Sequence, residues 1–187
     1  KHAHETLIRY AHEEQLLVCF DPNLRFSLWN DEAALYQSVH EFMPHADILK
    51  ISDEELSFIT GKTNIEDALD DLLKDQTKLV IYTKGKEGVC AYTKTCKAEA
   101  VGLAVECRDT TGAGDSFIGA FLYCLLRDEV LSIDALTQAQ LYEYLSFANA
   151  YAAYTVTQAG ALDAMADAQT FAKFRSELKL SSNFDIK

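Results

Sequence analysis

The stretch Asp109-Thr110-Thr111-Gly112-Ala113-Gly114-Asp115-Ser116-Phe117 lies between a strand that we expect to end near Val105 and an apolar helix expected over 113–127. Its two glycines flank an alanine and leave the backbone uncovered at the helix start. The first N–H groups of a helix have no intrahelical partner, and the helix dipole favours negative charge beside them. The amides of residues 112–114 are therefore candidates to bind a transferring phosphoryl group.

Asp115 comes directly after these glycines, within the first helical turn. A carboxylate at this position can accept the proton of an attacking hydroxyl while the amides hold the phosphoryl oxygens. The alternative is a helix cap combined with a packing turn, which is the commoner meaning of a lone Gly-x-Gly followed by Asp.

Helical and strand patterns alternate along the rest of the chain, which is typical of a parallel α/β sheet. We expect helices over 1–15, 31–45, 53–60, 64–76, 113–127, 141–155 and 168–178. We expect strands over 16–20, 46–50, 78–83, 89–93 and 97–105. The last two strands look antiparallel and are expected at a sheet edge. No repeat or linker interrupts the pattern, so one layered unit is the simplest organisation.

Composition excludes several classes of protein. The net charge is −12, from 29 acidic and 17 basic residues, and such a charge repels nucleic acids and anionic membrane surfaces. ATP remains possible, because backbone amides and a metal ion can set the local potential. No apolar run approaches the length of a membrane helix. The five cysteines form no Cys-x-x-Cys pair and predict reduced thiols in a cytoplasmic protein.

The nine-residue stretch resembles the second signature of the ribokinase/PfkB carbohydrate kinases. This resemblance implies a three-layer α/β fold of the ribokinase-like kind, with a mostly parallel sheet flanked by helices. It implies that Asp115 is the catalytic base and that the 112–114 amides form the anion hole. The expected cofactors are ATP, Mg²⁺ and a potassium ion, and the expected partners are ATP and a small-molecule sugar.

Two further segments resemble the nucleotide site of that family. Thr83-Lys84-Gly85-Lys86-Glu87-Gly88 comes after a predicted strand and resembles the loop on the phosphate side. Glycines there let the backbone approach ATP, although an ordinary hairpin turn has the same composition. The segment from Phe147 to Ala161 resembles the helix and loop on the adenine side. It implies that Asn149 contacts the nucleotide, against the alternative of a polar residue on a packed helix.

The resemblance also implies metal sites. Asp109, Thr111 and Gly160 are candidates for the monovalent cation site. Glu55 matches the glutamate of an Asn-x-x-Glu motif that tunes magnesium through water, but Ser52 replaces the asparagine. The alternative for the acidic residues around Glu55 is a solvated helix start.

Asp21-Pro22-Asn23-Leu24-Arg25 resembles the DPNxR segment of fructokinases and of 2-keto-3-deoxygluconate kinases. At the carboxyl end of a parallel strand it would face the active crevice. Asn23 and Arg25 are therefore the substrate candidates, with Arg25 orienting a sugar or a phosphate. A structural salt bridge of the loop is the competing explanation for Arg25.

Other candidate motifs fail on their spacing. Gly61-Lys62-Thr63 lacks the earlier glycine of a Walker A loop, because position 56 is leucine. A dinucleotide-binding loop that began at Gly112 would need its third glycine at position 117, but this residue is Phe117. The histidines at positions 2, 4 and 12 have no ligand partners at fixed spacing, which favours an exposed helix over a metal site.

The chain opens on Lys1 inside a helical pattern, which predicts that residues upstream are missing. The resemblance implies that the missing part holds the first signature, most sugar-binding residues and a β-sheet lid that makes a homodimer contact. We therefore expect residues 1–187 to be the carboxy-terminal nucleotide-binding and catalytic part, poorly active alone. The expected reaction is phosphorylation of fructose to fructose 6-phosphate. A 2-keto-3-deoxygluconate, ribose or nucleoside kinase, a non-catalytic nucleotide-binding module and a structural domain remain alternatives.

Overall fold

The computed structural model of this chain describes residues 2–178. Their contacts divide into two compact units. The first unit contains the described residues up to Gly85 together with Cys90–Lys97 and Ile133–Ala135. The second unit contains Lys86–Val89, Ala98–Ser132 and the described residues from Leu136 onward.

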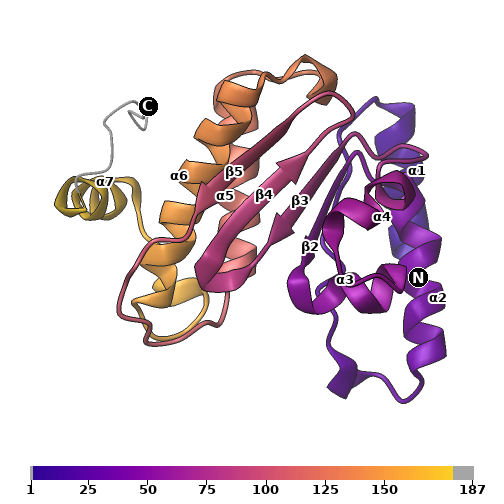
Figure 1. The fold of residues 1–187 in the computed structure, drawn as a ribbon, viewed down its shortest axis with the longest axis horizontal. Coiled ribbons are helices and arrows are strands. Elements are labelled where there is room, and N and C mark those ends of the chain that lie inside the picture. Colours follow the sequence, from indigo (N-terminus) through magenta and orange to yellow (C-terminus); the bar gives the residue numbers. More distant parts are fainter. Residues whose placement is uncertain (1, 179–187) are drawn as a thin grey trace. The chain divides into compact units, whose positions relative to one another are not determined.

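Five strands form one sheet in the order β1-β2-β3-β4-β5 (Figure 1). Their bounds are Cys19–Phe20, Ile48–Ser52, Leu79–Thr83, Gly88–Tyr92 and Lys97–Val101. The first three strands run parallel, with Phe20 opposite Leu49 and Ser52 opposite Thr83. Backbone hydrogen bonds join Thr93 to Cys96 and Gly102 to Glu87, a pairing that only antiparallel strands can make. The sheet is therefore mixed, with its parallel part in the first unit.

Four helices accompany the parallel strands of the first unit: α1 His2–Glu13, α2 Glu32–Phe42, α3 Asp53–Thr60 and α4 Ile65–Leu72. The side chain of Asp31 caps α2 by accepting the Ala33 N–H at 2.9 Å, and Asn64 caps α4 in the same way. Alternate residues of β2 and β3, such as Leu49 and Val80, point to one face of the sheet. There they share a buried core with apolar residues of α2, α3 and α4.

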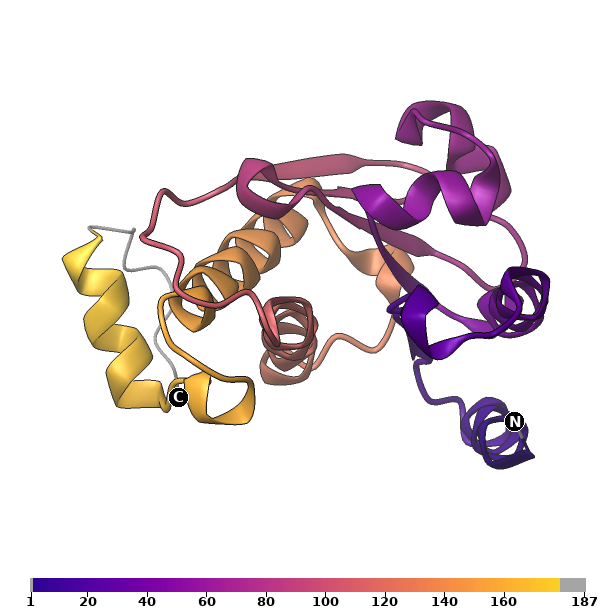
Figure 2. The ribbon, with the colours of Figure 1, turned by 90° about the horizontal axis from the view of Figure 1, so that it is seen from below.

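The described part of the second unit contains three helices: α5 Ala113–Arg127, α6 Gln138–Val156 and α7 Ala168–Glu177. Figures 1 and 2 both show α5 and α6 side by side. The rings of Phe121 and Tyr144 meet edge to face between them, with centroids 6.1 Å apart. Both side chains are fully buried.

Among the described residues, five short 3₁₀ segments connect these elements, at Phe26–Leu28, Met43–His45, Gly85–Glu87, Ile133–Ala135 and Leu162–Ala164. None of the helices within residues 2–178 combines the length and apolar character of a membrane-crossing segment.

The predicted elements are confirmed in order and type, and several boundaries differ. The strand expected over 16–20 is only Cys19–Phe20, and the strand expected to end near Val105 ends at Val101. Residues 102–112 form a loop instead. The helix expected to reach Gln76 ends at Leu72, because the next run of Asp, Lys and Gln offers few apolar residues to pack.

A substitution at Gly88 tests how closely the backbones of β4 and β5 approach each other. Its φ is +112°, and a Cβ there would lie 2.2 Å from the Ala100 carbonyl oxygen. We expect Gly88→Ala to lower the free energy of unfolding by about 3 to 5 kcal/mol, from backbone strain and steric overlap together. Gly61 also has a positive φ, of +70°, but open space around it, so Gly61→Ala should cost about 1 to 2 kcal/mol. Equal losses in urea denaturation would contradict this explanation.

Candidate active site

The start of α5 has the geometry that the glycine signature predicts. Gly112 occupies the N-cap with a φ of +78° and a ψ of 1°, the conformation of the third residue of a type II turn. Its Cα lies against Ala161, where an added Cβ would meet the Ala161 Cα at 3.4 Å. Glycine is therefore favoured here by backbone conformation, whereas an added Cβ would make only an ordinary van der Waals contact.

The amides at this helix start differ from the expectation at one residue. The Ala113 N–H donates to the Thr110 carbonyl at 3.2 Å, closing the turn, so it is not open as predicted. Within residues 2–178, the N–H groups of Gly112, Gly114 and Asp115 have no acceptor. The Asp115 amide was missed from the sequence, although its position in the first turn could have indicated it.

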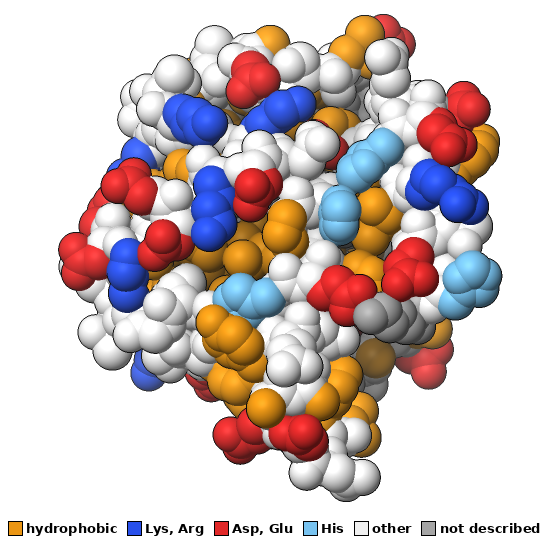
Figure 3. All heavy atoms as spheres, turned by 90° about the vertical axis from the view of Figure 1, so that its right-hand side faces the viewer, with side chains coloured by type: hydrophobic (Ala, Val, Ile, Leu, Met, Phe, Trp, Pro, Cys, Tyr) orange, Lys and Arg blue, Asp and Glu red, His pale blue; other side chains and the backbone are white. Residues whose placement is uncertain are grey.

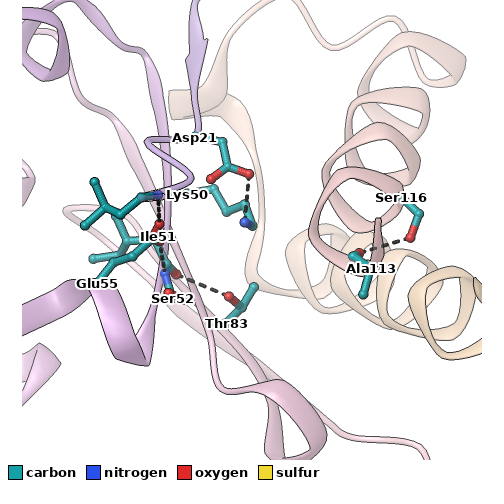
Figure 4. Close-up of polar contacts among 9 residues, drawn as sticks. Asp21, Lys50, Ile51, Ser52, Glu55, Thr83, Ala113 and Ser116 are labelled. Atoms are coloured by element: carbon teal, nitrogen blue, oxygen red, sulfur yellow. Dashed lines mark hydrogen bonds and ion pairs between the residues drawn. The ribbon is translucent and has the colours of Figure 1, made fainter. Parts of the chain in front are cut away.

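Asp115 lies off the buried stripe of α5. Ser116 and Phe117 are buried, and the Ser116 hydroxyl donates back to the Ala113 carbonyl at 3.0 Å (Figure 4). Asp115 itself is exposed, and its carboxylate has no hydrogen bond or ion pair among the described residues. A carboxylate placed this way can accept a proton from a bound hydroxyl.

Asp109 braces the loop that precedes α5. One carboxylate oxygen accepts the Thr111 N–H at 2.9 Å and the other accepts the Gly160 N–H at 3.0 Å. The backbone N–H groups of Arg108 and Asp109 both donate to the Val156 carbonyl near the end of α6. The three predicted cation-site residues, Asp109, Thr111 and Gly160, are thus brought together, and their hydrogen bonds give Asp109 a structural task besides.

The predicted nucleotide residues fall in different settings. The Asn149 side-chain nitrogen donates to the Val101 carbonyl at 2.6 Å, which leaves its Oδ1 without a partner among the described residues. Gly88 has the packing requirement described above, which the sequence did not indicate. Gly85 has a φ of +53° in open space, and Lys86 is exposed.

The remaining predicted residues lie just beyond the carboxyl ends of parallel strands in the first unit. Asp21 comes directly after β1, Ser52 is the last residue of β2, and Thr83 is the last residue of β3, followed by Lys84. Because these strands are parallel, the segments that follow them share one edge of the sheet. The Thr83 hydroxyl contacts the Ile51 carbonyl at 3.4 Å (Figure 4). Asn23 has a positive φ of 44°. The side chain of Arg25 is exposed and has no hydrogen-bonding partner among residues 2–178. No salt bridge of Arg25 is therefore seen in this part of the chain.

Glu55 is buried, with 7% of its surface exposed. Its Oε1 accepts the Leu24 N–H and its Oε2 accepts the Ser52 N–H, each at 2.8 Å. Ser52 is the N-cap of α3 and Glu55 its third residue, the spacing of a capping box. The Ser-x-x-Glu pattern could have predicted this contact from the sequence.

Beside it, the Lys50 ammonium lies 2.7 Å from an oxygen of Asp21, and both side chains are largely buried (Figure 4). Burial raises the pKa of the Asp21 carboxyl, and the adjacent ammonium only partly offsets that rise. Neither Asp21 nor Lys50 was singled out from the sequence as a functional residue.

A groove of about 320 Å³ lies between α1 and α2, with Ile8, His12, Phe42 and His45 among its lining residues. Figure 3 views that side of the chain, where histidines lie among hydrophobic and acidic side chains. None of the predicted site residues lines this groove. The described residues also contain no group of three His, Cys, Asp or Glu side chains that could hold a metal ion.

Comparisons with known proteins agree with these motifs. The family described as pfkB family carbohydrate kinase matches residues 1–168. The Arabidopsis thaliana protein named "Probable fructokinase-5" is 40% identical over 179 residues, which cover 94% of this chain and 54% of the relative. The chain therefore spans about half the length of the curated relatives it matches.

Two solved structures share the fold. A fructokinase from Vibrio cholerae O395, with fructose, ADP and a calcium ion bound, superposes with a TM-score of 0.78 at 35% identity. That match covers 89% of this chain and 53% of the other. Aminoimidazole riboside kinase from Salmonella enterica, complexed with aminoimidazole riboside and an ATP analog, gives 0.78 at 29% identity, over 93% of this chain and 57% of the other.

The bracing role of Asp109 predicts an acid-sensitive loop. Hydrogen bonds from Thr111 and then Gly160 lower the pKa of the Asp109 carboxyl from 3.8 to about 2. Because the folded-state pKa is lowered, its stabilisation is present above pH 3.8 and is lost as the pH falls toward 2. The ¹³C chemical shift of the Asp109 carboxyl should titrate with a midpoint near pH 2. A midpoint at or above 3.8 would contradict this.

Proposed function

Because this chain belongs to the pfkB family of carbohydrate kinases, we propose that its protein transfers the γ-phosphoryl group of ATP to a hydroxyl of a sugar. The family and the ribokinase-like α/β fold inferred from the glycine signature are confirmed by the family match and by the two superposed kinases. Since the chain spans about half of its relatives, the activity of the whole protein is proposed here.

The unpartnered amides at the start of α5, with an exposed Asp115 in the same turn, carry the proposal. In the proposed reaction the amides hold the γ-phosphoryl oxygens, and Asp115 takes the proton of the sugar hydroxyl. The hydroxyl oxygen forms a bond to the γ-phosphorus as the bond to the bridging β–γ oxygen breaks, which releases ADP. Positioning and charge stabilisation supply most of the catalysis in such a transfer.

The nucleotide is proposed to lie along Thr83–Gly88, with Asn149 toward its base. The open backbone at Gly85 and the exposed Lys86 support a phosphate contact. The free Oδ1 of Asn149 can accept one hydrogen bond from a base amino group.

Magnesium would neutralise phosphate charge in this reaction. Mg²⁺ commonly keeps several waters and binds through substrate phosphates plus one or two carboxylates, which fits a chain whose described residues contain no cluster of three ligands. For a potassium ion, Asp109, Thr111 and the carbonyl of Gly160 would supply oxygen atoms, and the hydrogen bonds of Asp109 already bring the three residues together. The cytoplasmic location and the homodimer stay predictions. Magnesium tuning by Glu55 is also untested, and the two backbone N–H groups that its carboxylate already accepts favour another role.

Fructose is the proposed sugar, with Asn23 and Arg25 as its contacts in this chain. The 40% identity to a relative named as a fructokinase and the 35% identity to the fructose-bound kinase support this choice. The exposed, unpaired Arg25 side chain supports a contact to a ligand.

Replacing Asp115 tests the mechanism. We expect Asp115→Asn in the intact protein to lower kcat by about 10² to 10⁴, the usual contribution of a general base, while ATP still binds. Asp134→Asn, at another exposed carboxylate, is the control and should leave kcat unchanged. Unaltered turnover in Asp115→Asn would favour a non-catalytic nucleotide-binding module.

A sugar panel tests the substrate. With the intact protein, ATP and Mg²⁺, we expect kcat/KM to be highest for fructose among fructose, 2-keto-3-deoxygluconate, ribose and a nucleoside. Arg25→Ala should raise the KM for the preferred sugar or the nucleotide about tenfold, the loss expected for one charge-assisted hydrogen bond. A preference for 2-keto-3-deoxygluconate would identify the alternative kinase, and failure to bind ATP would favour a structural domain.

A further inference from the structure

The segment after β1 is held in an unusual backbone conformation with little support from its own strand. β1 contains only Cys19–Phe20, and Asn23 two residues beyond Asp21 has a φ of +44°. A non-glycine residue in this region is strained, although asparagine tolerates it better than most. Such a conformation persists only where the surroundings fix it.

Two buried side chains provide that fixation. The Glu55 carboxylate bridges the Leu24 N–H and the Ser52 N–H, so it ties the segment after β1 to the segment after β2. The Lys50 ammonium binds Asp21 at 2.7 Å with only 8% of the lysine side chain exposed. Hydrogen bonds to charged groups are stronger than neutral ones, and breaking them at a buried position leaves unsatisfied groups.

We propose that Glu55 is a positioning residue, which holds residues 21–25 in the conformation that presents Asn23 and Arg25 to the substrate. It acts through the Leu24 backbone and not by tuning magnesium. The sugar contact rests on the proposed function, whereas the tether itself does not.

The geometry separates this role from a magnesium role. Both oxygens of Glu55 face N–H donors at 2.8 Å, and the residue is buried, whereas the neighbouring Asp53 and Glu54 are more exposed on the same helical turn. A glutamine at 55 would keep one acceptor and turn an NH₂ donor toward one of the two N–H groups. Glu55→Gln therefore breaks the bridge while preserving the shape of the side chain.

The experiment compares Glu55→Gln with Glu54→Gln in the intact protein. Hydrogen exchange should show the Leu24 amide protected in the wild type, and exchange about tenfold faster in Glu55→Gln but not in Glu54→Gln. The KM for the sugar should rise about tenfold in Glu55→Gln, with a smaller change in kcat, and the Mg²⁺ concentration giving half-maximal rate should stay the same.

Three results would overturn the inference: an unprotected Leu24 amide in the wild type, unchanged exchange in Glu55→Gln, or a shifted Mg²⁺ requirement with an unchanged sugar KM. An unprotected Leu24 amide in the wild type would overturn the tether even if Glu55→Gln does not fold. A wild type that phosphorylates no sugar would refute the proposed function, and the exchange data would still test the tether separately.

Discussion

The left-handed backbone at Gly112 is the constraint on which the second unit's site depends. Gly112 is the N-cap of α5, and the amides of Gly112, Gly114 and Asp115 have no acceptors among the described residues. Asp109 makes this turn rigid by accepting hydrogen bonds from Thr111 and Gly160. A preorganised set of donors binds an anion without the cost of reorientation, which is the physical basis of the proposed phosphoryl transfer.

The first unit applies the same principle with side chains. Parallel strands bring residues 21–25, 52–55 and 83–85 to one edge of the sheet because their carboxyl ends coincide. The strands do not by themselves position the segments that leave them at this edge. Glu55 and Lys50, both buried, make that connection from β2 and the start of α3. The loop geometry in both units thus depends on carboxylates that accept backbone N–H groups.

Most of the helices and strands could be predicted, because they depend on sequence patterns among neighbouring residues. Alternating apolar patterns predicted every helix and strand, and Asp31 and Asn64 mark helix starts that the structure confirms. Boundaries were less accurate at 102–105, although Gly102 marks the end of the strand, and at 73–76, where no glycine or proline marks the end of the helix. The Ser-x-x-Glu pattern of Ser52 and Glu55 could have predicted a capping box, but it was interpreted as a magnesium motif in which serine replaces asparagine.

The sequence by itself determined the α/β order, the family signature and the position of Asp115 in the first turn of its helix, because each depends on residues close together in the chain. Only the tertiary structure decided three contacts. The Ala113 N–H closes a turn, the Ala100 carbonyl leaves no room for a side chain at Gly88, and the Glu55 carboxylate accepts the Leu24 N–H. The contacts of Gly88 and of Glu55 join residues that no local pattern relates, whereas the Ala113 turn depends on the backbone conformation of Gly112. Distance in space, and not residue type, decides such roles.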